Sequence, residues 1–452
     1  MLPDLDWIST SGFSYKLKQV LINVQNAERT GNNYYVNLHD LVSNPVFKNE
    51  DTYLSMSDDD AGMRLLSLFR YWNIIQYYFP YKYLIEEDWK NVLSEFIPKF
   101  INSKDKTAYT LTVLELITRV NDTHANIYGN KTLTDYFGKN NLSIQIKFIE
   151  NKAVITKFLK DEVRVESGLK PGDVIVAVNQ KPVEQIIREQ EKITPASNYE
   201  TKLRNISYKL FNTNDSNIVI TYKRDNIQKD ISLKTEPMEA ISKLLIEKGM
   251  KDTCFKILKG NIAYVYPGTI KDSHLPGIKK GIKGTKGLII DLRCYPSQFI
   301  VFSFGQYLVP KPTQFVKFTH GDFFNPGLFT FKADPPKVGQ LFNPNYYKNK
   351  VVILINEATQ SQAEYTTMAF RTAPKSIVVD STTAGVDGNI SPISLPGDIN
   401  TVISGIGIYY PDGRETQRVG IVPDIEVRPT ITGIRQGRDE LLEKAIELIN
   451  QE

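Results

Sequence analysis

Residues 358–365, ATQSQAEY, place Ser361 three residues before Glu364. A Ser-x-x-Glu pattern is typical of a helix start, because the serine oxygen accepts a hydrogen bond from the first turn and the glutamate accepts one from the serine N–H. The same position offers free N–H groups and the positive end of the helix dipole, which would stabilise an alkoxide or an oxyanion. Ser361 is therefore either a helix cap or a nucleophile.

A nucleophilic serine needs a base, since its neutral hydroxyl is a weak nucleophile. The chain has four histidines, and one of them, His124, lies in the polar segment NDTHANIYGN. A histidine titrates near neutrality, so it can accept the serine proton and later give it to a leaving group. The alternative for His124 is an ordinary loop histidine that is hydrogen-bonded to the backbone.

The N-terminal part of the chain predicts an arm followed by helices. Residues 1–58 mix short polar and aromatic stretches and end near the acidic SMSDDD. From Asp58, apolar residues recur at three- and four-residue steps, which predicts a helix that Pro80 closes. Two more helices are predicted at EEDWKNVLSEFIPKFI and TAYTLTVLELITRV, so residues 59–135 form a helical unit. The Asn, Asp and Gly residues of NDTHANIYGN mark a loop.

Residues 138–235 change to a two-residue period, which is typical of strands. Strands are predicted at LSIQIKF, KAVITKF, NIVITYK and QKDISLK, with a further strand from Val174 to Val178 between turns and a helix from about Val183. This segment is therefore a β-rich unit. The following MEAISKLLIEKGM predicts a helical connector over residues 236–253.

Residues 254–452 predict an α/β unit. The stretches NIAYVYPG, KGLIIDLR, KVVILINE and SIVVDST are short and nearly continuously apolar, as buried parallel strands are. Helical stretches such as QAEYTTMAFRTA separate several of them, and GRDELLEKAIELIN predicts a helix at the end of the chain.

Composition excludes several classes of protein. A chain of 452 residues with 41% apolar and 23% charged residues is expected to form two to four globular domains. The net charge of +4 is spread over scattered lysines, so nucleic acid is not an expected partner. No apolar run reaches the roughly 18 residues of a membrane span. Cys254 and Cys294 are far apart and have few histidines near them, which predicts two isolated buried thiols, or alternatively a disulfide, rather than a zinc site.

Four separated motifs together resemble one family. SGLKPGDVIVAVNQKPV resembles a PDZ-domain segment of the C-terminal processing and tricorn-like serine peptidases. GLIIDLRCYPS, VVILINEATQSQAEYTTMAFR and GIGIYYPDGRETQRVGIVPDIEV resemble three further motifs of that family, in the same order. The resemblance covers about residues 60–440. It implies a helical N-terminal region, a PDZ-like domain, and an α/β catalytic domain related to crotonase-like folds, with peptide-bond cleavage by a serine and no metal or other cofactor.

The resemblance also implies site residues. It makes Ser361 the nucleophile and the Gln362 N–H an oxyanion donor. The lysine that processing peptidases use as a base is matched by Val386, so a Ser–Lys dyad is excluded at its usual place. The tricorn-like branch uses a histidine instead, which His124 matches.

Two partners of that histidine are changed in this chain. The tricorn-like serine before the histidine is matched by Thr123, whose hydroxyl could still orient the imidazole. The tricorn-like glutamate is matched by Gln417, which carries no charge to stabilise an imidazolium. Asp122 or Glu415 could take its place, or no residue does.

The family's oxyanion loop also differs here. Its Gly-Gly pair is matched by Ser297-Gln298, and a residue bulkier than glycine could turn the N–H away. Asp291 and Arg293, at the end of the preceding strand, are expected to form a structural ion pair.

The PDZ-like unit predicts a second site, because PDZ domains add a peptide C-terminus as a strand. The expected edge is Asn141-Leu142-Ser143-Ile144, with Gly138 in the carboxylate loop. The alternative is a strand whose apolar residues only face the core.

These inferences predict a serine endopeptidase that cleaves unfolded or C-terminal segments of proteins. One alternative is a catalytically degenerate relative that only binds peptides or proteins, and another is a hydrolase or acyl transferase for non-peptide substrates. The family predicts export to the periplasm or cell envelope, with the signal peptide trimmed, because MLPDLDWIST lacks signal-peptide features. A homo-oligomer is compatible with this prediction.

Overall fold

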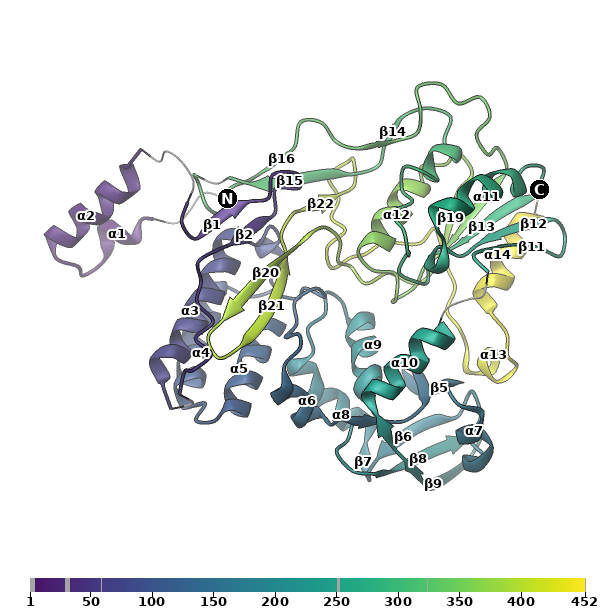
Figure 1. The fold of residues 1–452 in the computed structure, drawn as a ribbon, viewed down its shortest axis with the longest axis horizontal. Coiled ribbons are helices and arrows are strands. Elements are labelled where there is room, and N and C mark those ends of the chain that lie inside the picture. The colour runs from purple at the N-terminus through teal and green to yellow at the C-terminus, as the bar shows by residue number, and fades with distance from the viewer. Residues whose placement is uncertain (1–4, 29–32, 58, 250–252, 323, 452) are drawn as a thin grey trace.

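The computed structural model describes residues 5–28, 33–57, 59–249, 253–322 and 324–451. Parts of two predicted segments therefore lie outside the described residues. These parts are residues 1–4, 29–32 and 58 of the predicted arm and residues 250–252 of the predicted connector. The rest of the arm is more ordered than expected. It contains α1 (Trp7–Thr10), α2 (Tyr15–Asn26) and the antiparallel pair β1 (Val36–Leu38) and β2 (Pro45–Phe47). In Figure 1, α1 and α2 lie apart from the rest of the ribbon.

The predicted helices of the next segment are confirmed. They are α3 (Ala61–Tyr78), the short 3₁₀ turn η1 (Lys82–Leu84), α4 (Trp89–Asn102) and α5 (Lys106–Thr118), followed by the unpredicted α6 (Lys131–Phe137). Side chains of Asp60, Asp88, Asp105 and Asn130 cap the starts of the four α-helices. The loop that carries His124 lies between α5 and α6, as the sequence predicts.

The β-rich segment forms a twisted antiparallel sheet in the order β4-β5-β6-β8-β9, with β7 paired to β6. Its elements are β3 (Asn140–Asn141), β4 (Ile144–Ile149), β5 (Lys152–Phe158), α7 (Asp161–Ser167), β6 (Val174–Val178), β7 (Lys181–Pro182), α8 (Val183–Gln190), η2 (Glu191–Ile193), α9 (Tyr199–Lys209), β8 (Asn217–Arg224), β9 (Ile227–Lys234) and β10 (Glu236–Pro237). The predicted connector is α10 (Met238–Gly249). The helix α9 was not predicted, because it is mostly polar and buries only four residues.

The last segment contains the predicted parallel sheet, in the order β11-β12-β13-β18-β19-β23. Strands β12 (Ile262–Val265), β13 (Gly287–Asp291), β18 (Lys350–Leu354), β19 (Ser376–Asp380) and β23 (Ile425–Glu426) are parallel, and β11 (Phe255–Leu258) is antiparallel to β12. The other elements are η3 (Pro267–Thr269), η4 (Asp272–His274), α11 (Leu275–Gly281), η5 (Gly305–Tyr307), β14 (Thr313–Gln314), β15 (Lys317–Gly321), β16 (Phe329–Phe331), β17 (Lys337–Val338), α12 (Gln362–Phe370), β20 (Ile390–Leu395), β21 (Ile399–Ser404), β22 (Ile408–Tyr409), α13 (Ile431–Arg435) and α14 (Glu440–Asn450).

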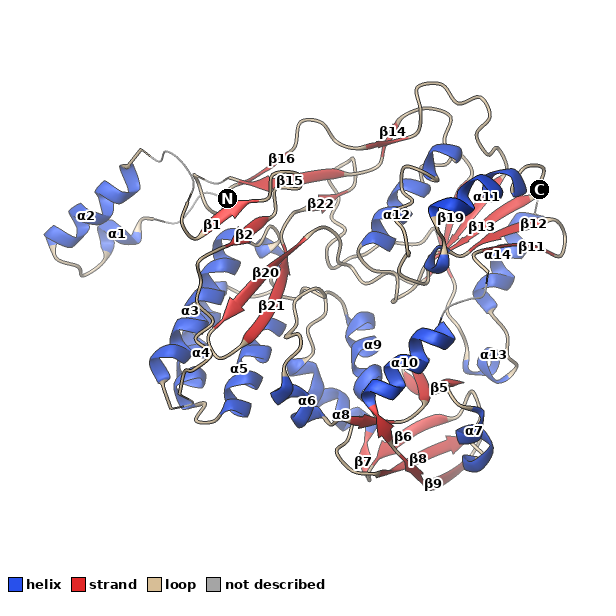
Figure 2. Ribbon diagram, viewed as in Figure 1, coloured by secondary structure: helices blue, strands red, loops and turns tan. Residues whose placement is uncertain are grey.

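Both faces of this sheet are covered, which explains its continuously apolar strands. On one face Leu288 and Ile290 of β13 pack in a core with residues of α11 and α12. On the other face Ile289 packs in a core with residues of α14. Figure 2 shows these helices on the two sides of the strands. The start of α12 therefore lies at the carboxyl ends of β13 and β18, where α/β sheets bind ligands.

The antiparallel hairpin β20–β21 leaves this α/β segment and joins the helical one. Four of its apolar residues belong to the same core as α3, α4 and α5: Ile393, Leu395, Ile399 and Ile403. The hairpin lies alongside α3 and α5 in Figure 1. This packing brings the end of β21 to the loop after α5, although the two are about 280 residues apart.

Smaller predictions can be checked directly. Cys254 and Cys294 are free thiols, and both are partly rather than fully buried. Arg293 forms the predicted ion pair with Asp291 and a second one with Asp439. Within the described ranges, no helix is both long enough and apolar enough to cross a membrane.

Candidate active site

Ser361 lies at the N-cap of α12, and the reciprocal capping box with Glu364 is present. Its backbone is not that of an ordinary cap, however, because φ is 55° and ψ is −118°. N-cap residues have extended backbone as a rule, as Ser14, Asp105 and Asn198 do at other helices of this chain. A non-glycine residue in this region of φ and ψ is strained, and such strain is concentrated at functional sites.

Glu364 ties the turn at Ser361 to a second loop, residues 383–388. Its buried carboxylate accepts hydrogen bonds from the N–H groups of Ser361, Gly385 and Val386 and from the Thr383 hydroxyl. Burial raises the pKa of Glu364 to about 7, and these donors act in the opposite direction. Ser361 itself donates to the carbonyl of Val386 at 2.9 Å. The backbone of Ser361 is thus held by the 383–388 loop.

The loop of His124 contacts this same 383–388 loop. The Thr123 hydroxyl oxygen lies 3.3 Å from the carbonyl oxygen of Ala384 and 3.0 Å from the Ser197 hydroxyl, and it accepts from the Ser197 N–H at 2.8 Å. The structure therefore brings His124 and Ser361 to one loop. The prediction that Thr123 orients the imidazole is wrong in this structure, because its hydroxyl is engaged by Ala384 and Ser197.

The imidazole of His124 is held by Ser404 instead. Its Nδ1 lies 2.9 Å from the Ser404 Oγ, which donates to Asp122 at 3.0 Å, and Asp122 also accepts from the N–H of His124. Because the Ser404 proton goes to Asp122, Ser404 can only accept from Nδ1, so Nδ1 carries the proton and Nε2 has a free lone pair. Burial lowers the pKa of His124, while the nearby Asp122 raises it.

Among the two acids considered as substitutes for the family glutamate, only Asp122 contacts this relay. Glu415 accepts a hydrogen bond from Tyr83 and is partly exposed. Gln417 is buried at 1% exposure, and neither of its amide atoms has a partner among the described residues. Ser404 was missed by the sequence interpretation, because nothing in its local sequence marks it.

In the oxyanion loop, one of the two residues that replace Gly-Gly has its N–H turned away, as the sequence predicts. The Ser297 N–H donates to the carbonyl of Pro267 at 3.1 Å, so it points away from Ser361. Gln298 lies against the helix start, since its carbonyl accepts from the Gln362 side chain at 2.8 Å. Among the described residues, the N–H groups of Gln298 and Gln362 have no acceptor. These two N–H groups are the candidate oxyanion donors.

Comparisons with known proteins indicate a peptidase family. Residues 310–427, which include Ser361 and the 383–388 loop, match the model of peptidase family S41. This segment of the chain is similar to peptidase family S41. Members of this family are serine peptidases, and the match confirms the family that the sequence motifs resemble. No curated protein sequence matches the chain.

The fold of this chain is similar to solved structures with low sequence identity. Mature CPAF complexed with lactacystin is 13% identical with a TM-score of 0.67, covering 87% of this chain and 99% of that one. A putative peptidase from Parabacteroides merdae is 16% identical with a TM-score of 0.52, covering 86% and 96%. At such identities the likeness shows the fold, a mixed α/β arrangement with several sheets.

The residues predicted to bind a peptide mostly have partners within the chain. Asn141 pairs with Glu236 of β10, which also accepts from the Ser143 hydroxyl, and Leu142 is buried. At Gly138, a Cβ would lie 2.4 Å from the Thr213 backbone, so glycine is required there by packing. Ile144 begins the edge strand β4, and a peptide added as a strand would pair with this edge.

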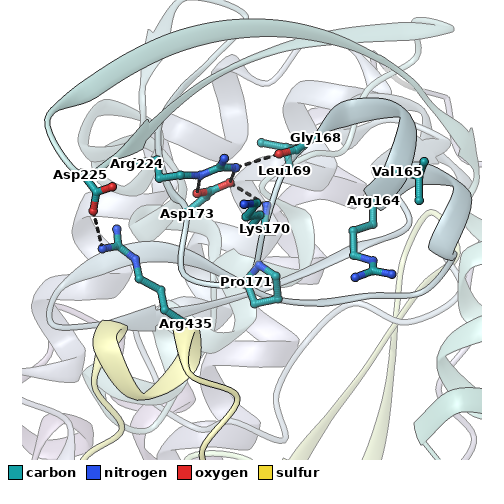
Figure 3. A pocket seen from close by; sticks show the side chains of 10 residues that line it. All are labelled: Arg164, Val165, Gly168, Leu169, Lys170, Pro171, Asp173, Arg224, Asp225 and Arg435. Atoms are coloured by element: carbon teal, nitrogen blue, oxygen red, sulfur yellow. Dashed lines mark hydrogen bonds and ion pairs between the residues drawn. The ribbon is translucent and has the colours of Figure 1, made fainter.

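A hollow of about 510 Å³ lies elsewhere, between the β-rich sheet and α13. Figure 3 shows that two of its arginines are already paired: Arg224 with Asp173, and Arg435 with Asp225. None of the candidate catalytic residues lines it. This hollow therefore adds nothing to the site at Ser361.

Proposed function

We propose that this chain is an endopeptidase of family S41 in which Ser361 attacks a peptide carbonyl and His124 is the general base. The observation that carries the proposal is the backbone of Ser361, at φ 55° and ψ −118°, between β18 and α12. A plain cap needs no such strain, whereas a sharp strand-to-helix turn presents a serine Oγ beside free helix N–H groups.

The reaction has two steps. The Ser361 Oγ forms a bond to the carbonyl carbon while its proton moves to Nε2 of His124, and the N–H groups of Gln362 and Gln298 stabilise the oxyanion. His124 then gives the proton to the leaving amine as the C–N bond breaks, which leaves an acyl-enzyme. Water, activated by the same imidazole, hydrolyses the ester and restores Ser361. Asp122 stabilises the imidazolium through Ser404.

The sheets and helices of the chain support a proposed role for each of its domains. The six-stranded sheet with α8 and α9 is the proposed PDZ-like domain, and its edge strand β4 would present an unfolded or C-terminal segment. The parallel sheet with α11, α12 and α14 is the proposed crotonase-like catalytic domain. The tricorn-like branch is favoured because Val386 is fully buried in the lysine position, whereas His124 is available. Export to the cell envelope is proposed from the family alone.

A binding-only relative is the second candidate. It is favoured by the Ser297 N–H, which points away from Ser361, and by the uncharged, unpartnered Gln417. The two candidates differ in whether Ser361 is nucleophilic.

Labelling with a fluorophosphonate probe tests the proposal. The wild-type chain is expected to be labelled at Ser361 and to hydrolyse an unfolded protein such as reduced, alkylated casein. Absence of both labelling and hydrolysis under conditions in which the chain is folded would favour the binding-only candidate.

Asp122→Asn is expected to lower kcat/KM for peptide hydrolysis by roughly 100-fold, because the imidazolium loses its counter-charge. The base must be neutral, and burial lowers the pKa of His124 below its usual value. The wild-type activity is therefore expected to fall on the acid side with a midpoint below the usual pKa of a histidine. Since Asp122 raises the pKa of His124, the variant should lose its remaining activity only at a still lower pH.

The matched control is Glu415→Gln, which removes the other carboxylate near this region. It is expected to leave both kcat/KM and the acid limb unchanged, because Glu415 contacts Tyr83 and not the relay. A pH–rate profile of the three proteins checks the prediction. An Asp122→Asn profile identical to that of the wild type would contradict the role of the relay.

A further inference from the structure

A group of five aromatic rings adjoins the candidate oxyanion loop and the start of α12. Tyr365 of α12 is central: it stacks with Phe299 and with Phe318, and its ring meets Phe315 edge-on at 5.0 Å. Phe302 contacts both Phe299 and Phe315. We call these five residues the aromatic platform.

The platform is only partly covered. Phe315 and Tyr365 are buried, but Phe299 is 53% exposed and Phe302 is 42% exposed. Large exposed aromatic rings that contact each other are costly to leave in water and often mark a binding surface. Among the described residues, no side chain fully covers the rings of Phe299 and Phe302.

Neighbouring residues and hydrogen bonds connect the exposed rings to the turn that carries Ser361. Tyr365 is one helical turn after Ser361, and its N–H donates to the Ser361 carbonyl at 3.0 Å. Phe299 follows Gln298, whose carbonyl accepts from the Gln362 side chain at 2.8 Å. The stack of Phe299 on Tyr365 therefore bridges the two segments that supply the candidate oxyanion donors.

The segment that carries Phe299 and Phe302 contains no charged side chain. Residues 294–310, CYPSQFIVFSFGQYLVP, contain no Asp, Glu, Lys, Arg or His. A charged side chain would find no partner within this segment and would lose hydration there. An apolar or aromatic side chain would instead bury its surface against the rings.

We infer that the aromatic platform is a specificity subsite for an aromatic or large aliphatic side chain on the acyl side of the scissile bond. This inference rests on the proposed function and names its substrate class. In a bound substrate, the N–H groups of Gln298 and Gln362 hold the carbonyl oxygen of one residue. The side chain of that residue is attached to the Cα next to the carbonyl carbon. That side chain consequently lies within reach of Phe299.

Two peptidyl diphenyl phosphonates, one ending in a phenylalanine analogue and one in an alanine analogue, test the subsite. Both carry the same warhead for Ser361, so their ratio of labelling rates reports only on the side chain. Wild-type protein is expected to react roughly ten-fold or more faster with the phenylalanine analogue. Phe299→Ala is expected to bring that ratio close to one, and any general change in the reactivity of Ser361 affects both phosphonates and cancels in the ratio.

Phe331→Ala is the matched control. Phe331 is 51% exposed and also packs on one tyrosine ring, that of Tyr409, but it lies outside the platform. It should keep the wild-type ratio.

A wild-type ratio near one, or a ratio that Phe299→Ala does not change, would overturn the subsite while the proposed peptidase activity stands. If even the fluorophosphonate fails to label folded protein, the proposed function fails and the subsite with it.

Discussion

Ser361→Ala is expected to abolish hydrolysis of unfolded protein, with a loss of roughly 10⁴-fold or more in kcat, because no other group can form the acyl-enzyme. The fold should survive the change. Alanine keeps the L-configuration that the turn already accommodates, and the N–H of residue 361 can still donate to Glu364 and Val386. Hydrolysis rates measured on proteins with matched circular dichroism spectra check this expectation.

A second serine separates the roles of cap and catalyst. Ser14 caps α2 with its side chain, which accepts from the Leu17 N–H at 3.3 Å, and its backbone is extended. Ser14→Ala is expected to weaken that helix by about 1 kcal/mol and to leave turnover unchanged. If Ser361→Ala behaved like Ser14→Ala and turned over substrate at the wild-type rate, Ser361 would be a cap only.

The elements that carry strong local patterns could be predicted from the sequence. The strands β13 and β18 are continuously apolar because helices cover both of their faces, and α12 begins at a Ser-x-x-Glu pattern. The sequence could therefore place Ser361 at a strand-to-helix turn. It could not show the positive φ there, because serine has no preference for that conformation and only the surrounding hydrogen bonds impose it.

The partners of His124 show why the rest could not be predicted. Ser404 reaches Nδ1 only because the β20–β21 hairpin packs against α3 and α5, through apolar residues that would suit many other positions. The sequence contains no signal for which surface an amphipathic hairpin will cover. Thr123, directly beside His124, was the natural expectation, yet its hydroxyl is engaged by Ala384 and Ser197.

Glu364→Ala is expected to lower the free energy of unfolding by about 4 kcal/mol, because it leaves several buried donors without an acceptor. Those donors are the N–H groups of Ser361, Gly385 and Val386 and the Thr383 hydroxyl. Labelling of Ser361 by a fluorophosphonate should also slow strongly even where the variant is folded, since the turn loses the contact that holds it to the 383–388 loop. Urea unfolding and labelling rates at a urea concentration well below the transition measure the two effects separately.

Asp387 provides the contrast, because it is a second fully buried acid that lies close to Glu364. Burial and the nearby Glu364 raise the pKa of Asp387 well above its usual value, which disfavours the charged form of this carboxyl. Its Oδ1 accepts from the Gly388 N–H, and its Oδ2 has no partner among the described residues. Asp387→Asn keeps the shape of the side chain and removes a charge that burial already disfavours, so it is expected to change stability by less than about 1 kcal/mol. Equal losses in Glu364→Ala and Asp387→Asn would mean that burial of an acid, and not the set of donors around Glu364, determines the stability of the turn at Ser361.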